Sequence, residues 1–80
     1  MTNPTLKAII ANASLLVDRL ERATALARDA HNALRQGEQN LAIGTLLPAQ
    51  EDLGDADALL RTIFVLHRSR AGITKSGGVQ

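Results

Sequence analysis

Apolar residues recur every three or four positions through the first half of the chain, which is the spacing of one face of an α-helix. Asn3 and Pro4 form a helix-start signal, because asparagine caps free N–H groups and proline suits the first helical position. Gly37 stands where a helix-ending glycine is expected. We therefore predict a helix over residues 4–36. Its apolar stripe consists of Ile9, Ala13, Leu16, Leu20, Ala23, Ala27, Ala30 and Leu34.

The second half of the chain keeps the same spacing without a change of phase. Its stripe consists of Ala42, Leu46, Ala49, Leu53, Ala56, Leu60, Ile63 and His67. A loop has no reason to preserve a helical period, so the glycine- and proline-containing segment 41–54 belongs to a predicted helix over residues 39–69. Because proline cannot donate to the carbonyl four residues earlier, we expect a kink near Gly44–Pro48. The alternative is a break, with a new helix starting at Pro48.

Two long helices separated by a glycine turn predict an all-α fold, an antiparallel two-helix hairpin that reverses near residues 37–39. Folding the two stripes about residue 38 pairs residues whose numbers add to 76. Five of the resulting eight layers place a large side chain opposite an alanine. Such layers let two backbones approach closely and still fill the space between them.

Both edges of the predicted hairpin carry further apolar residues. One edge holds Ile10, Val17, Thr24, His31, Ile43, Leu47 and Val65, and the other holds Leu15, Leu26, Leu41, Leu59 and Leu66. Burial of the stripes alone does not offset the entropy lost when about sixty residues become ordered. We therefore predict a homodimer that forms a four-helix bundle through one edge and leaves the other edge for a partner.

Composition narrows the class and the setting of the protein. The chain has 80 residues, and Phe64 is its single aromatic residue. It has no cysteine, which excludes a disulfide-stapled scaffold and a thiolate metal site. No apolar run approaches the roughly 20 residues that a membrane span requires. The start of the chain lacks the features of a signal peptide, so we expect a cytoplasmic protein without a membrane segment. We expect residues 1–70 to form the domain and residues 71–80, with glycine and serine, to be a disordered tail.

Residues suited to catalysis or metal binding are few and scattered. His31 and His67 fall near opposite ends of the hairpin, where they cannot share a metal ion within one chain. Asp52, Asp55 and Asp57 cluster near a glycine, but they lack the spacing of a calcium loop and are expected to form a solvated face. We therefore expect no enzyme activity, no cofactor and no metal.

Charge is unevenly distributed, with a net of −5 over residues 38–60 and +4 over residues 61–80. Arg19 and Arg22 lie one helical turn apart and suit phosphate contacts, to which a dimer adds Arg61, Arg68 and Arg70. A small dimeric RNA- or DNA-binding regulator is therefore one hypothesis. Against it, acidic residues interleave with the arginines and aromatic residues for base stacking are lacking. The other hypothesis is a protein-binding module, which needs only a rigid hairpin with a spare apolar edge flanked by arginines.

The stretches "NASLLVDRLERATALARDAHNAL" and "NLAIGTLLPAQEDLGDADALLRTIFVLHRSR" resemble the small Ala/Leu-rich helical-hairpin accessory proteins of temperate phages and other mobile elements. The resemblance covers residues 5–70 and consists of length, composition and hairpin layout. It implies an inhibitor or anti-activator that binds a host protein, such as a quorum-sensing transcriptional regulator or a pilus-assembly ATPase. From their shared edge, the expected partner-binding residues are Leu15, Arg19, Arg22, Leu26, Leu59, Leu66 and Arg70.

Overall fold

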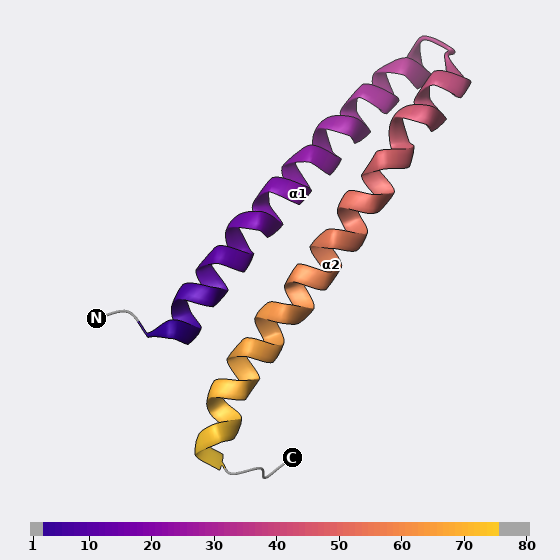
Figure 1. The fold of residues 1–80 in the computed structure, drawn as a ribbon. Helices are drawn as coiled ribbons and strands as arrows, with labels where there is room; N and C mark the ends of the chain where they lie inside the picture. The colour runs from indigo at the N-terminus through magenta and orange to yellow at the C-terminus, as the bar shows by residue number, and fades with distance from the viewer. Residues whose placement is uncertain (1–2, 76–80) are drawn as a thin grey trace.

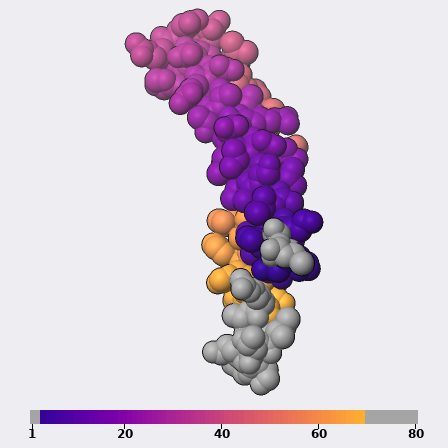
Figure 2. All heavy atoms as spheres, turned by 90° about the vertical axis from the view of Figure 1, so that its left-hand side faces the viewer, coloured from indigo at the N-terminus to yellow at the C-terminus, as the bar shows by residue number. Residues whose placement is uncertain are grey.

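Two long helices account for nearly all of the protein. The computed structural model describes residues 3–75, and the side chains up to residue 69. Helix α1 (Pro4–Arg35) and helix α2 (Gln39–Lys75) run antiparallel side by side, joined by a turn over residues 36–38 (Figure 1). The hairpin is 57 Å long and only 14 Å deep along its shortest axis, so that in Figure 2 α1 covers most of α2. The predicted all-α hairpin is confirmed.

Both ends of α1 are made by local signals in the sequence. At its start, the side-chain oxygen of Asn3 accepts a hydrogen bond from the backbone N–H of Leu6, at 2.6 Å. At its end, Gly37 has a φ of +78°, in the left-handed region that favours glycine. The N–H of Glu38 donates to Ala33 O at 2.9 Å and that of Gly37 to Leu34 O at 3.0 Å. This is the Schellman arrangement, and it reverses the chain at the predicted place.

Helix α2 passes through Pro48 without interruption. The helical interpretation of residues 41–54 is therefore confirmed, and the alternative of a break at Pro48 is wrong. The predicted kink near Gly44–Pro48 stays a prediction. The helix also continues to Lys75 rather than ending at residue 69, since the single Gly72 costs only about 1 kcal/mol in a helix interior and no proline follows. Of the expected tail, residues 76–80 lie outside the described residues.

The core between the two helices is made of small side chains. Its buried residues are Ala23, Ala30, Ala33, Ala42, Ala49, Asp52 and Ala56. Near the turn, Leu46 packs against a cluster of Ala30, Ala33 and Ala42. Alanines at the contact let the two backbones approach closely, which is why so little side-chain volume is enclosed.

The predicted pairing of the two stripes is wrong, because six of its sixteen residues are exposed: Leu20, Ala27, Leu34, Leu53, Leu60 and His67. Leu20, Leu34, Leu53 and Leu60 were expected in the core, but they are 38–53% exposed. Their places are taken by the residues that precede them, Arg19, Ala33, Asp52 and Leu59, which are buried or half-buried. The interface positions in the two helices thus mirror each other with numbers that add to 75, not 76. Each helix is rotated about its own axis by roughly 50° from the expected orientation, given about 100° per residue.

The rotation gives the hairpin two different sides. On one side, exposed apolar residues from both helices form what we call the leucine face, which comprises Leu6, Ile10, Val17, Leu20, Leu34, Ile43, Leu53, Leu60 and Phe64. The opposite side, the arginine face, holds the charged contacts between the helices and comprises Leu15, Arg19, Arg22, Asp52, Asp55, Leu59 and Thr62. Helical geometry places these two sets of residues on opposite sides of the contact between α1 and α2.

Candidate functional site

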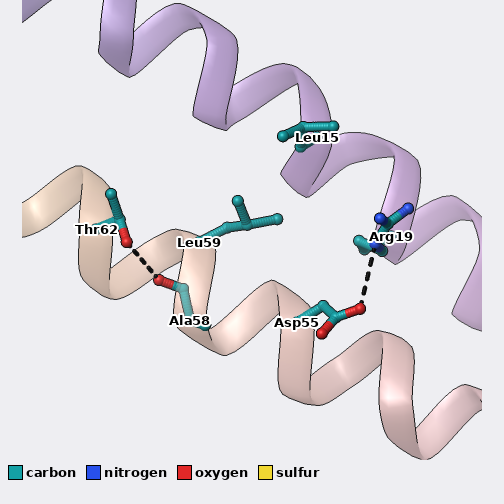
Figure 3. Close-up of a pocket in the computed structure, with 6 residues that line it drawn as sticks. All are labelled: Leu15, Arg19, Asp55, Ala58, Leu59 and Thr62. Atoms are coloured by element: carbon teal, nitrogen blue, oxygen red, sulfur yellow. Dashed lines mark hydrogen bonds and ion pairs between the residues drawn. The ribbon is translucent and has the colours of Figure 1, made fainter.

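A shallow hollow opens on the arginine face between the two helices (Figure 3). Leu15 and Arg19 reach it from α1, and Asp55, Ala58, Leu59 and Thr62 line it from α2. Leu15 is 45% exposed and Leu59 is half-buried, so the hollow presents apolar surface to solvent. The hydroxyl of Thr62 donates to the carbonyl of Ala58 at 3.0 Å, so its hydrogen is already used within α2. The charged groups in the lining are Arg19 and Asp55, which form an ion pair.

Ion pairs join the two helices along this face. Arg19 Nε lies 3.4 Å from Asp55 Oδ2, and one turn further toward the hairpin turn Arg22 Nε lies 3.2 Å from Asp52 Oδ2. The Arg19 pair is partly open to water, so Coulomb attraction there is screened and stabilises the hairpin only modestly. Its guanidinium is therefore available to exchange partners when another acidic group approaches.

Asp52 is the unusual residue of the interface. It is 4% exposed among buried alanines, and its Oδ2 accepts no hydrogen bond of good geometry although the Arg22 guanidinium is near. The expectation that Asp52, Asp55 and Asp57 form a solvated face is therefore wrong for Asp52, because the rotation of α2 turns this residue inward. Asp55 and Asp57 remain exposed, and Asp57 pairs with Arg61 on the same helix at 2.9 Å.

The expected partner-binding residues meet only in part. Leu15, Arg19 and Leu59 come together at the hollow, and Arg22 lies beside it with 62% of its side chain exposed. Leu26 and Leu66 are half-buried at interface positions, since the one-position rotation points them toward the other helix. Arg70 belongs to α2, but its side chain lies outside the described residues.

Three of the five arginines that suggested phosphate contacts have acidic neighbours. Arg19, Arg22 and Arg61 each lie within 3.4 Å of an aspartate oxygen. A phosphate that binds any of them must displace a carboxylate or accept its repulsion, which weakens the counterion release that drives nucleic-acid binding. The charges of the arginine face are thus balanced by pairing across the two helices.

The leucine face was predicted only in part: Ile10, Val17 and Ile43 belong to one of the two predicted edges, whereas Leu20, Leu34, Leu53 and Leu60 had been assigned to the core. It holds nine of the thirteen large apolar side chains that are exposed among the described residues. One signal for it is present in the sequence: the positions Leu6, Ala13, Leu20, Ala27 and Leu34 alternate leucine and alanine every seven residues. Such a ridge, with a hole at each alanine, is the pattern of a helix that packs against another helix.

Within residues 3–69, no three histidine or acidic side chains gather in a geometry that holds a metal ion. Neither helix, over its described residues, has a stretch long and apolar enough to cross a bilayer. No protein-family model, curated protein or solved structure matches the chain.

Proposed function

We propose that this chain is a non-enzymatic protein-interaction module that acts as a small inhibitor or anti-activator encoded by a phage or another mobile element. In this proposal it works in the cytoplasm as a homodimer and binds a host regulatory protein, such as a transcriptional regulator. The observation that carries the proposal is the hollow of the arginine face, where Leu15, Leu59 and Arg19 converge from both helices.

The chemistry of the hollow favours a protein ligand. An apolar side chain from a partner fits between Leu15 and Leu59, while Arg19 and Arg22 lie ready for carboxylates at its rim. Arginine is one of the residues that most often dominate binding energy at protein interfaces, and apolar contacts around it keep water out. The partner that fits best is therefore an amphipathic helix or loop with a leucine-like anchor next to aspartate or glutamate.

Capture from host lysate with a tagged chain, followed by measurement of the affinity for the purified partner, tests the proposal. Leu15→Asp places a charge in the hollow and is expected to weaken binding at least about 100-fold, while helicity by circular dichroism is unchanged. Leu47→Asp is the matched control, because Leu47 is also exposed but lies on α2 away from the hollow. Equal loss of affinity in both variants, or in neither, contradicts the assignment of the site.

The nucleic-acid hypothesis makes an opposite prediction that the same protein sample tests. Binding through phosphate contacts falls steeply as salt rises, because each contact releases condensed counterions. A gel-shift titration with RNA and duplex DNA at low and at physiological salt distinguishes the nucleic-acid hypothesis from the protein-partner hypothesis. Tight, salt-dependent retardation that is lost in an Arg19→Ala, Arg22→Ala double variant would replace the protein-partner proposal.

A further inference from the structure

The leucine face is a long apolar surface with no partner inside the hairpin. Its nine side chains are 38–57% exposed, and they come from both helices along most of the described length. Among the described residues at the helix positions of this face, the only aspartate, glutamate, lysine or arginine is Asp57, and Arg61 balances it at 2.9 Å. A face that is this extended and this poor in charge is typical of an interaction surface.

The hairpin alone has little else to hold it together. Its buried apolar residues are six alanines, and no large side chain is fully enclosed within the described residues. Chains of this size rarely bury enough surface to be stable alone, and the shortfall is usually made up by oligomerisation or by a staple. Because the chain has no cysteine, a disulfide cannot supply that staple. The large apolar side chains that the core lacks lie exposed on the leucine face.

We propose that a second copy of this chain covers the leucine face, so that two hairpins form a four-helix bundle with their turns at opposite ends. The proposal deepens the homodimer of the proposed function by naming its face and its orientation. It does not depend on which host protein the arginine face binds.

The area of the face fits a second copy. Nine large side chains that each expose about half of their surface amount to about 700 Å² per chain, close to the roughly 800 Å² per partner of a standard stable interface. A two-fold dimer also needs a patch that complements itself. In an antiparallel pair of α1 helices, pairing residues whose numbers add to 47 places Leu20 over Ala27 and Leu34 over Ala13, so the ridge of alternating leucine and alanine complements itself.

Charge sets the orientation. Residues 20–55, which form the half of the hairpin nearest the turn, carry six acidic and three basic residues, a net charge of −3. The remaining residues, which form the half with the chain ends, carry two acidic and six basic residues, a net charge of +4. When the second copy lies antiparallel, the acidic half of each chain faces the basic half of the other. A parallel arrangement would place like charges together along the whole bundle.

The mass of the protein in solution tests the face. Light scattering on the wild type is expected to give twice the chain mass of 8.5 kDa at micromolar concentration. Leu20→Lys should raise the dimer dissociation constant about 100-fold or more, because a two-fold interface contains the substituted residue of both copies. Leu15→Lys is the matched control, since Leu15 is equally exposed on the same helix but lies on the arginine face, and it should leave the dimer intact. A monomeric wild type, or a dimer lost only in Leu15→Lys, overturns the proposal.

A cross-link keeps the test valid if Leu20→Lys unfolds the chain. Because the protein has no cysteine, Leu20→Cys and Leu15→Cys introduce single thiols into an otherwise unchanged chain. A bifunctional maleimide with a short spacer should join two copies through position 20 and not through position 15. Cross-linking through position 15 alone would place the interface on the other face and overturn the assignment.

The orientation has its own measurement. Spin labels on a Glu38→Cys variant mark the two turns, which should lie about 45 Å apart in an antiparallel bundle, given a rise of 1.5 Å per helical residue. The dimer should also weaken as salt rises, because the complementary halves are screened. Labels closer than about 20 Å would indicate a parallel dimer and overturn the proposed orientation. If the wild-type protein forms this dimer but binds no host protein, the proposed function is refuted and the dimer proposal stands.

Discussion

Arg22 Nε lies 3.2 Å from Oδ2 of Asp52, so an exposed guanidinium meets a carboxylate that is only 4% exposed. Burial removes water from the carboxylate, and the Arg22 guanidinium offsets little of this desolvation cost. It makes no hydrogen bond of good geometry to Oδ2 and is itself well hydrated. Together with the Arg19–Asp55 pair, this ion pair nevertheless distinguishes one register of the two helices from its neighbours, since sliding α2 by a turn in either direction would leave one of the two aspartates without its arginine.

Removal of the buried carboxylate should stabilise the hairpin. We expect Asp52→Ala to raise the free energy of unfolding by about 1 kcal/mol, because it lines the interface with another alanine and leaves Arg22 free in water. Arg22→Ala should lower it by about 1 kcal/mol, because Asp52 then has no counterion. Urea denaturation at a fixed chain concentration measures both. Destabilisation by Asp52→Ala would show that the pair contributes more than its desolvation costs.

The rotated register can be tested at neighbouring residues. Ala33 is buried between the helices, so Ala33→Leu should overpack the contact and destabilise the protein by about 1–3 kcal/mol. Asn32 is exposed, and Asn32→Leu should leave stability unchanged or slightly increased, since leucine is the better helix former. Thermal denaturation of the two variants, compared at equal concentration, distinguishes them. Tolerance of Ala33→Leu would indicate that the helices meet through the leucine stripe after all.

Two glycines should respond in opposite directions to the same substitution. Gly37 has a φ of +78°, so Gly37→Ala should destabilise the turn by about 1 kcal/mol. Gly54 is inside α2 with open space around an added Cβ, so Gly54→Ala should stabilise the protein by about 0.5–1 kcal/mol. The comparison of their melting temperatures is the measurement. A shift of the same sign in both would place Gly37 outside a left-handed turn.

Pro48 should weaken α2 at its centre. Pro48→Ala restores an N–H that donates to the carbonyl of Gly44, and we expect the free energy of unfolding to rise by at least about 1 kcal/mol. Hydrogen exchange should slow at the same time for amides of residues 44–52, because local opening of the helix becomes more costly. If partner binding requires α2 to bend, the same variant should bind the partner more weakly although it folds more stably. Unchanged exchange rates would show that the proline is already accommodated without cost.

Most of the outline was predictable from local signals. Asn3 and Pro4 place the start of α1, Gly37 places its end, and both act through hydrogen bonds within a few residues, so no tertiary information is needed. The helical period through Pro48 was likewise readable from spacing alone. The candidate site was predictable only in part, since Leu15, Arg19 and Leu59 share an edge in the sequence pattern, whereas the inward turn of Asp52 breaks the rule that charges stay in water.

The amino-acid sequence by itself determined two helices, their turn and the stripes of apolar residues along them, because capping and periodicity are properties of neighbouring residues. Only the tertiary structure decided which part of each stripe faces the other helix. A rotation of about 50° turns Leu20, Leu34, Leu53 and Leu60 outward and brings the residues before them, Arg19, Ala33, Asp52 and Leu59, inward without disturbing any local signal. The short alanine side chains bring the backbones together, and four of the six leucines that the sequence pattern assigned to the core, Leu20, Leu34, Leu53 and Leu60, are turned to the surface.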